Sequence, residues 1–322
     1  MRILYLTNMY PTVSNPASGI FVKEQIDFLE KEGINYDLFV IEGSKSKWNY
    51  ITAISKLTAI LKETDYDILH AHFGYSGIIA LLSRWLSNIK ILLIVTFHGS
   101  DILGKGTKRI PAMVCRKMVK FFDNVIVVCE EMKRFLPEIQ NIITVPMGVN
   151  MDLFYPIDRQ KARQKLSFNE NNKILIFGGD PNNLVKNYNL AYAAFKMVKS
   201  KFSDTILIVL KDWERKSVPF LMNAVDVLLL TSFWEGSPMV VKEAMACNLP
   251  IVSTDVGDVK RNIEGLEGCY ICSYEPEDVA DKIMKALNFG RRTNGRRQLI
   301  KLGLTQEEVA RKIIGVYRSV IK

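Results

Sequence analysis

Two carboxylates eight residues apart, Glu235 and Glu243, are the clearest candidates for chemistry in this sequence. Glu235 follows an apolar run that is typical of a buried strand, and Glu243 falls within the helix expected next. A carboxylate that accepts hydrogen bonds from two neighbouring hydroxyls suits a sugar or a ribose, at roughly 1.5 to 3 kcal/mol per charge-assisted bond. Spacing alone is weak evidence, because a loop carboxylate and a surface helix residue paired with a cation would give the same pattern.

The turn between these carboxylates is suited to an anion. Gly236 permits a tight turn, Ser237 is expected to cap the following helix, and Pro238 suits its first position. The backbone N–H groups around 237–239, with Met239 among them, would then point freely toward a diphosphate at the helix N-terminus. The segment therefore predicts a site for a sugar nucleotide, in which each carboxylate binds one of the two sugar rings.

All three histidines of the chain, His70, His72 and His98, fall at the ends of neighbouring strands. A shared metal ion is one interpretation, but no carboxylate or thiolate spacing completes a ligand set. We expect histidines of the core, or ones that support a neighbouring residue, and no metal. Cys269 and Cys272 form a lone CxxC inside an apparent strand, and a structural role is expected for this pair as well.

The net charge of +9 is concentrated in two stretches. Residues 102–122 carry six cations and no acid, and residues 282–306 carry seven cations and no acid. An anionic membrane surface is one explanation for such stretches, and solvated helix faces are an equally good one. No recognised nucleic-acid-binding module accompanies them, so nucleic acid is not an expected partner.

Composition predicts a globular protein of the cytoplasm. Hydrophobic residues make up 48% and charged residues 24% of the 322, and mean hydropathy is close to zero. The longest apolar passage, 78–97, is interrupted by Arg84, Asn88 and Lys90, so no transmembrane segment is predicted. The first residues lack the long apolar stretch of a secretory signal, and five cysteines without paired spacing fit reduced thiols.

Short β-branched runs alternate with helical periodicity along the chain, which predicts an α/β fold. Six such runs precede residue 148 and five follow residue 172, so each series predicts a doubly wound parallel sheet. We expect two Rossmann-like domains that face a central cleft, the first at 1–157 and the second at 158–305. The amphipathic last helix, 306–322, can pack on either domain, and packing back on the N-terminal domain is the arrangement we expect.

Residues 232–258, which contain both carboxylates, resemble the donor-binding segment of the retaining GT-B glycosyltransferases of family 4. Further segments resemble the family in the same order, namely SGIFVKEQ at 18–25, HAHFGYSG at 70–77, TFHGSD at 96–101, VPMGVN at 145–150 and LFYP at 153–156. The resemblance covers essentially the whole chain. It implies the GT-B fold and transfer of a glycosyl group from a nucleoside diphosphate sugar to a hydroxyl, with retention at the anomeric carbon and without a metal ion.

The resemblance also implies roles for single residues. Gly19 would let its backbone approach the donor phosphate. His98 would lie near the reacting anomeric carbon, Asp101 beside the acceptor, and Lys186 against the diphosphate. Together with Glu235, His98 and Lys186 form the expected catalytic set. The expected donor-binding set comprises Gly19, Lys186, Glu235, Gly236, Ser237, Pro238, Met239 and Glu243.

The sequence departs from the family pattern in two places. An arginine usually accompanies the lysine, but its approximate place holds Asp180 or Pro181. Only fourteen residues, 211–224, separate two strands where the family commonly has a further strand and helix that help to hold the base. The nucleotide of the donor, UDP or GDP, is therefore left open. Three residues are candidates for contacting it: Lys211, Asp212 and Trp213.

These observations predict a hexosyl- or N-acetylhexosaminyl-type glycosyltransferase that acts on a saccharide. A lipid-linked saccharide is preferred, because the amphipathic basic segment 107–122 suits anionic lipid. The expected role is cell-surface polysaccharide or glycolipid synthesis, peripherally at the inner face of the plasma membrane. Two alternatives stand beside it. A sugar-nucleotide epimerase of similar fold would need no acceptor, and a non-catalytic partner protein that retains the fold would explain the missing arginine.

Overall fold

The computed structural model of the chain describes residues 1–13, 15–43, 45–104 and 109–321. It divides into two compact units, Met1–Gly148 with Gln306–Lys322 (unit 1) and Val149–Thr305 (unit 2). The first boundary predicted from the sequence lies at 157 instead. The difference arises because Met151 and Phe154, which sequence alone puts in a linking loop, are buried in the hydrophobic core of unit 2.

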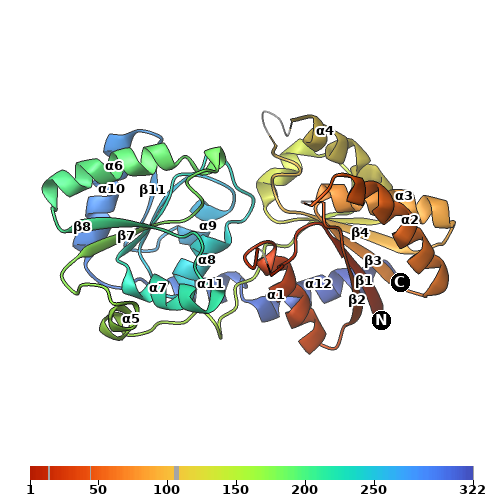
Figure 1. Cartoon of the computed structure of the whole chain (residues 1–322), viewed down its shortest axis with the longest axis horizontal. Helices are drawn as coiled ribbons and strands as arrows, with labels where there is room; N and C mark the ends of the chain where they lie inside the picture. Colours follow the sequence, from red (N-terminus) through yellow and green to blue (C-terminus); the bar gives the residue numbers. More distant parts are fainter. Residues whose placement is uncertain (14, 44, 105–108, 322) are drawn as a thin grey trace. The chain divides into compact units, whose positions relative to one another are not determined.

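Within the described residues, unit 1 contains a six-stranded parallel sheet in the order β2-β1-β3-β4-β5-β6 (Figure 1). The strands are β1 (Arg2–Thr7), β2 (Asn35–Val40), β3 (Ile68–His72), β4 (Leu92–Phe97), β5 (Asn124–Val127) and β6 (Ile142–Thr144). The helices are α1 (Ile20–Lys31), α2 (Trp48–Glu63), α3 (Gly74–Ser87), α4 (Arg109–Met118) and α12 (Gln306–Ile321). All six β-branched runs of the first series therefore form the predicted strands.

One face of this sheet is covered by two helices that are far apart in the sequence. Ile3 and Tyr5 alternate with residues of the opposite face, as the two-residue period of a strand requires, and pack with Ile26 of α1 and Tyr317 of α12. Figure 1 shows α12, drawn in blue, beside the red α1. The last helix is thus part of the core of unit 1.

Unit 2, which is described in full, contains a five-stranded parallel sheet in the order β11-β10-β9-β7-β8. Its strands are β7 (Lys173–Phe177), β8 (Thr205–Val209), β9 (Val227–Leu230), β10 (Ile251–Thr254) and β11 (Cys269–Cys272). Its helices are α5 (Arg159–Leu166), α6 (Tyr188–Lys201), α7 (Val218–Ala224), α8 (Met239–Ala246), α9 (Val259–Ile263), α10 (Pro276–Phe289) and α11 (Gly295–Leu302). The stretch 211–224 holds a 3-10 turn at Arg215–Ser217 and then α7, without a further strand.

Both faces of the second sheet are buried. Leu175 and Phe177 pack under α6 and α10, whereas Ile174 and Ile176 pack with α7 and α8 on the other face. Burial on both faces explains why these strands are continuous apolar runs in the sequence. None of the described helices is both long and apolar enough to cross a membrane.

The cysteine pair of β11 fits the structural role expected from sequence. Cys269 and Cys272 are the two ends of the strand, and both thiols are free. Burial raises the pKa of each thiol to about 12. Such thiols stay protonated at neutral pH and are poor nucleophiles.

Each sheet has one point at which the strand order reverses. In unit 1 it lies between β1 and β3, and in unit 2 between β7 and β9. Ligands of open parallel sheets collect at such points, beyond the carboxyl ends of the strands. The segments that leave β1, β3, β7 and β9 are therefore where side chains for chemistry are to be sought.

Candidate active site

Lys186 and Glu235 meet at the reversal point of unit 2. Lys186 ends a short 3-10 turn after β7, and Glu235 follows β9. The Lys186 Nζ lies 2.6 Å from Oε1 of Glu235, and the hydroxyl of Ser232 donates to the same oxygen at 2.7 Å. The side chains are 21% and 16% exposed, so the pair is shielded but open to an incoming ligand.

The backbone around Lys186 is fixed from both sides. The N–H of Phe233 donates to the carbonyl of Val185 at 2.9 Å, and the Thr231 hydroxyl donates to the carbonyl of Lys186 at 3.1 Å. These bonds tie the segment after β7 to the end of β9. A Cβ on Gly179 would lie 2.9 Å from the Lys186 stem, so glycine there lets that stem lie against the backbone.

The turn before α8 differs from the prediction. Helix α8 begins at Met239 with Pro238 as its N-cap residue, and Ser237 makes no side-chain cap. Instead the Ser237 hydroxyl donates to Oδ2 of Asp258 at 2.6 Å and accepts a hydrogen bond from Lys242. Lys242 is fully buried, 3.2 Å from the same Asp258 oxygen. The Ser237 hydroxyl binds this pair and does not cap the helix, because the buried Lys242 ammonium needs several oxygen partners.

Gly257 brings the loop that carries Asp258 against the turn at Gly236. Its φ is +56°, and a Cβ there would lie 2.1 Å from the carbonyl oxygen of Gly236. Only glycine combines that backbone conformation with so close an approach. The shape of the turn at Gly236 thus depends on a residue twenty-one positions further along the chain.

Glu243 is neither a surface residue nor unpaired. Its side chain is 6% exposed, and Oε1 lies 2.6 Å from a guanidinium nitrogen of Arg215, whose guanidinium also stacks 4.7 Å above the Phe154 ring. Arg215 follows β8 and Glu243 lies beyond β9, so the pair spans the carboxyl end of β7 between them. Arg215 is not among the residues predicted from the sequence. The available signal was a cation in the shortened connection after β8, at the same edge of the sheet as Lys186.

Asp180, one of the two residues predicted to lie at the approximate place of the usual arginine, has its own partner. Asp180 lies 3.2 Å from the Lys211 ammonium. Trp213, another candidate for contacting the base, donates its indole N–H to the carbonyl of Val209 at 3.2 Å and packs on the core of unit 2. Asp212 has a φ of +61° and shapes the turn between them.

Unit 1 contributes a glycine at its own reversal point. Gly19 immediately precedes α1 with a φ of +62°, and a Cβ there would lie 2.1 Å from the carbonyl oxygen of Met9. The loop that leaves β1 therefore folds tightly against the start of α1. Glycine at this position is required by geometry, whatever ligand approaches it.

Asp101 is turned toward its own loop. Its carboxylate accepts backbone N–H hydrogen bonds from His98 at 3.1 Å, Gly99 at 2.9 Å and Gly74 at 3.2 Å. Burial raises the pKa of Asp101 to about 6, and these hydrogen bonds oppose the rise. The carboxylate joins the loop after β4 to the start of α3, and so fixes the backbone of His98.

The three histidines form two hydrogen-bonded groups. Nδ1 of His72 lies 3.1 Å from Nε2 of His98, while His70 contacts the Tyr317 hydroxyl at 2.6 Å and the Thr96 hydroxyl at 2.8 Å. Burial lowers the pKa of all three, to about 3 for His72, so the rings are neutral at physiological pH. Among the described residues, no group of three or more His, Cys, Asp or Glu side chains is arranged to hold a metal ion.

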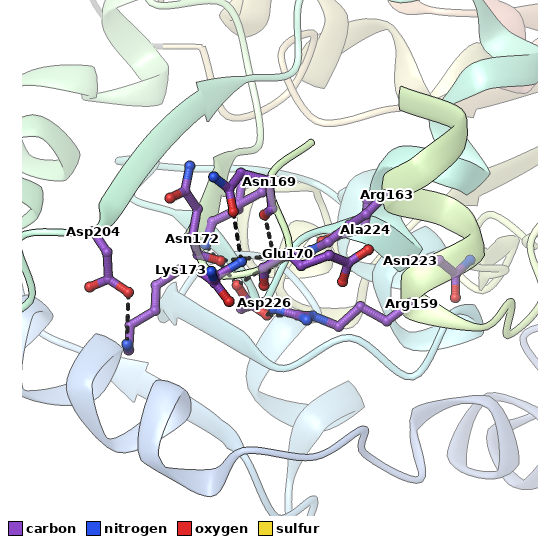
Figure 2. Close-up of polar contacts among 12 residues, drawn as sticks. Arg159, Arg163, Asn169, Glu170, Asn172, Lys173, Asp204, Asn223, Ala224 and Asp226 are labelled. Carbon is purple, nitrogen blue, oxygen red and sulfur yellow. Dashed lines mark hydrogen bonds and ion pairs between the residues drawn. The ribbon is translucent and has the colours of Figure 1, made fainter. Parts of the chain in front are cut away.

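A cavity of about 630 Å³ lies at the other edge of the second sheet, lined by residues that include Arg159, Lys173 and Asp226. Figure 2 shows that these charges are already paired: Lys173 with Asp204 at 3.1 Å, and Arg159 with Asp226 at 3.0 Å. The buried Arg163 also binds Asp226, at 2.9 Å. These contacts join loop ends at the amino ends of the strands, so this cavity is not the candidate site.

Both units match families of glycosyltransferases. Residues 18–153 match the family described as Glycosyltransferase Family 4, and residues 160–288 match Glycosyl transferases group 1. N-acetyl-alpha-D-glucosaminyl L-malate synthase of Bacillus anthracis is 24% identical over 72% of this chain and 68% of its own length. UDP-Gal:alpha-D-GlcNAc-diphosphoundecaprenol alpha-1,3-galactosyltransferase of Escherichia coli is 23% identical over 66% of this chain and 65% of its own length.

Solved structures share the fold over the whole chain. Sucrose-phosphate synthase from Thermosynechococcus elongatus gives a TM-score of 0.81 at 16% identity and covers 99% of both chains. HepE of Anabaena, in complex with UDP and glucose, gives 0.74 at 15% identity and covers 99% of this chain and 100% of its own. The two parallel-sheet units thus define a GT-B glycosyltransferase fold. With both family matches, the chain belongs to glycosyltransferase family 4, group 1.

Proposed function

We propose that the protein transfers a hexosyl or N-acetylhexosaminyl group from a nucleoside diphosphate sugar to a hydroxyl of a saccharide, with retention at the anomeric carbon. The observation that carries this proposal is the Lys186–Glu235 pair, 2.6 Å apart at the reversal point of the second sheet. A cation and a carboxylate that satisfy each other in the free protein can exchange partners when a ligand brings both phosphates and hydroxyls.

In the reaction, the bond between the anomeric carbon and the diphosphate oxygen breaks, and its electron pair stays on the diphosphate. Lys186 and the backbone N–H groups of Ser237 and Met239 stabilise that growing charge, which is the main source of acceleration in this mechanism. Glu235 accepts hydrogen bonds from sugar hydroxyls, and Glu243 accepts them from the ribose. The acceptor oxygen bonds to the anomeric carbon on the same face, and its proton passes to the departing diphosphate oxygen. This mechanism needs no metal ion.

We assign the remaining roles to unit 1. The Gly19 backbone approaches the donor phosphate at the tight turn that glycine permits before α1. His98 lies beside the anomeric carbon, and Asp101 orders the loop on the acceptor side through its three backbone hydrogen bonds. For the donor, UDP is preferred over GDP, because the structurally similar HepE binds UDP and glucose.

We further propose that the acceptor is lipid-linked and that α4 contacts an anionic membrane. Four large apolar side chains are exposed there or just beyond, Ile110 at 70%, Met113 at 48%, Val114 at 40% and Phe121 at 49%. Exposed cations accompany them: Arg109, Lys117 and Lys120. Two further cations, Lys105 and Lys108, lie outside the described residues. Apolar side chains ringed by cations suit a bilayer surface with anionic headgroups.

We therefore propose that the protein acts at the inner face of the plasma membrane, in cell-surface polysaccharide or glycolipid synthesis. The related galactosyltransferase of Escherichia coli is named for a diphosphoundecaprenol-linked acceptor, which supports this choice.

A thermal-shift screen across UDP- and GDP-sugars tests the donor part of the proposal. Binding to the folded state alone raises the melting temperature, by the equivalent of about 2.7 kcal/mol when ligand is a hundredfold above Kd. We expect one UDP-sugar to stabilise the protein. Without an acceptor, that UDP-sugar should not be converted into another nucleotide sugar. A new nucleotide sugar formed from donor alone would indicate an epimerase, and no stabilisation by any nucleotide would indicate a non-catalytic partner protein.

Vesicle sedimentation tests the membrane part. The protein is expected to bind phosphatidylglycerol vesicles at low salt, and Lys117→Glu with Lys120→Glu to abolish that binding. The matched control reverses Lys199 and Lys201, two exposed cations of α6, and should keep it. Equal binding by all three proteins, or binding by none, would contradict the assignment of α4.

A further inference from the structure

The two ring nitrogens of His72 have different surroundings. Nδ1 lies 3.1 Å from Nε2 of His98. Nε2 is buried and has no hydrogen-bond partner among the residues that the structure describes. The whole residue is inaccessible to solvent, so its hydrogen bond to His98 is shielded from competition by water.

This asymmetry decides which nitrogen carries the proton. If His98 donated, His72 would bury an N–H at Nε2 without an acceptor, and orphaned buried N–H groups are rarer and costlier than unused lone pairs. The favourable tautomer therefore has the proton on Nδ1 of His72, which donates to Nε2 of His98. Since a neutral imidazole carries one proton, His98 has its own on Nδ1. Both rings are kept neutral by burial.

Aromatic side chains fix the plane of the His98 ring. Its centroid lies 4.4 Å from that of Phe73 and 5.2 Å from that of Phe21. The His72 ring is nearly parallel to it, with an angle of 23° between the planes. These rings leave the edge orientation of His98 undetermined, because a ring flip about the Cβ–Cγ bond puts Cδ2 in place of Nδ1, and Cε1 in place of Nε2, without changing the plane. The hydrogen bond from His72 distinguishes the two orientations.

We infer that His72 is a positioning residue for the reaction, which holds His98 in one tautomer and one ring orientation so that it presents Nδ1–H to an oxygen of the bound donor sugar. The inference rests on the proposed function, because it gives His98 a place beside that sugar. His72 itself touches no substrate. His70, two residues earlier on β3, belongs to the separate group with Tyr317 and does not contact His98 through a hydrogen bond.

Long-range ¹⁵N–¹H spectra of the ligand-free protein test the geometry without any turnover. The chain has only three histidines, so each ring is assigned by single substitution. We expect His72 and His98 both to be protonated at Nδ1, and His98 to become a mixture of tautomers in His72→Leu. Protonation of His98 at Nε2 in the wild-type protein would overturn the inference.

Kinetics test the positioning role, with His72→Asn and His72→Leu as a pair of variants of nearly equal side-chain shape. The side-chain amide N–H of the introduced asparagine can replace Nδ1–H as a donor, whereas leucine cannot. We expect His72→Leu to lower kcat about tenfold or more with little change in donor KM, because misorientation of a catalytic group acts on the transition state. We expect His72→Asn to keep most of the wild-type kcat. Equal kcat in the two variants, or a wild-type kcat in His72→Leu, would refute the role.

Tyr317→Phe is the control for general damage to this core. It removes hydrogen bonds to His70 and Tyr5 and leaves the His72–His98 contact alone. Its melting temperature should fall while kcat stays within about twofold, as expected for a structural hydrogen bond. If the wild-type protein shows the expected tautomers but transfers no sugar, the proposed function and the positioning role fall together, and only the His72–His98 geometry stands.

Discussion

At the scale of residues, the candidate site is a set of charges that satisfy one another in the free protein. Glu235 pairs with Lys186, Glu243 with Arg215, and Lys242 with Asp258. The first two pairs are partly open and can exchange partners with a ligand. The third is buried under the turn, where breaking it would leave an uncompensated charge.

Lys186→Ala is expected to abolish sugar transfer while the fold survives. The ion pair with Glu235 is partly exposed and contributes about 0 to 1 kcal/mol to stability, whereas the lost charge opposite the diphosphate acts on the transition state. Steady-state transfer and urea unfolding of the same preparation would show the two effects separately.

The matched control for this substitution is Lys173→Ala. Lys173 is also a half-buried lysine in an ion pair, with Asp204 at 3.1 Å, but it lies at the amino end of β7. Its activity should match that of the wild-type protein. Full activity in Lys186→Ala, or equal losses in both variants, would contradict the assignment of Lys186.

Local sequence was enough to single out Glu235 and Lys186 as candidates, since each follows a strand of a recognisable series. It could not find Arg215 as the partner of Glu243, nor the role of Lys242. Both depend on pairs formed between residues far apart in the chain, Arg215 with Glu243 and Lys242 with Asp258. The prediction that Ser237 caps α8 was wrong for the same reason. The Ser237 hydroxyl binds the buried Lys242 and Asp258 instead of the helix N-terminus.

At the scale of elements, the turn between β9 and α8 depends on close approach by a neighbouring loop. Gly257→Ala should distort it, because the new Cβ would lie 2.1 Å from the Gly236 carbonyl oxygen. Gly265→Ala is the control, since Gly265 also has a positive φ, +71°, but nothing within 4 Å of its Cβ position. The control should lose only about 1 to 2 kcal/mol, the usual cost of a left-handed alanine.

Nucleotide binding separates the two glycine variants. Calorimetric titration with UDP should show wild-type affinity for Gly265→Ala and at least about tenfold weaker binding for Gly257→Ala, which would correspond to about 1.4 kcal/mol. Unaltered affinity in Gly257→Ala would mean that the turn at Gly236 does not bind the donor.

The buried His72 of β3 is expected to make the stability of unit 1 sensitive to acid. The folded-state pKa of His72 is about 3, below its value of 6.5 in the unfolded chain, so the unfolded state binds more protons between these values. Stability contributed by the neutral ring is full above pH 6.5 and falls as the pH drops toward 3, by roughly 2 kcal/mol between pH 7 and pH 5. Asp101, with a pKa of about 6, acts in the opposite direction.

Urea unfolding of wild-type and His72→Asn proteins at pH 7 and pH 5 measures this contribution. The wild-type protein should lose more unfolding free energy than the variant, because asparagine does not titrate, and the Asp101 contribution cancels in the comparison. An equal loss in both proteins would show that His72 is not held neutral by burial.

Elements were the most predictable level of this chain. Periodicity predicts every strand of both sheets, and the predicted helix 306–322 begins where α12 does, at Gln306. Strand order was not available from periodicity, because crossovers leave no local signature. The boundary at 157 was misplaced because Met151 and Phe154 lie in a stretch rich in loop residues, while their burial depends on contacts within unit 2.

At the scale of the whole molecule, two doubly wound sheets each present one reversal point, and the residues singled out for chemistry follow the strands at these points or next to them. The donor side that we propose therefore lies in unit 2, built on β7, β8 and β9, and a second set of groups lies in unit 1, built on β1, β3 and β4.

Hydrogen–deuterium exchange of the full chain, with and without its best-binding nucleotide sugar, tests whether the donor binds at the reversal point of unit 2. We expect protection at 178–186 and 232–243, the segments that carry Lys186, Glu235 and Glu243. Protection confined to 157–173 and 286–292, around the cavity at the amino ends of the strands, would contradict this assignment, as would no protection in unit 2 at saturating ligand.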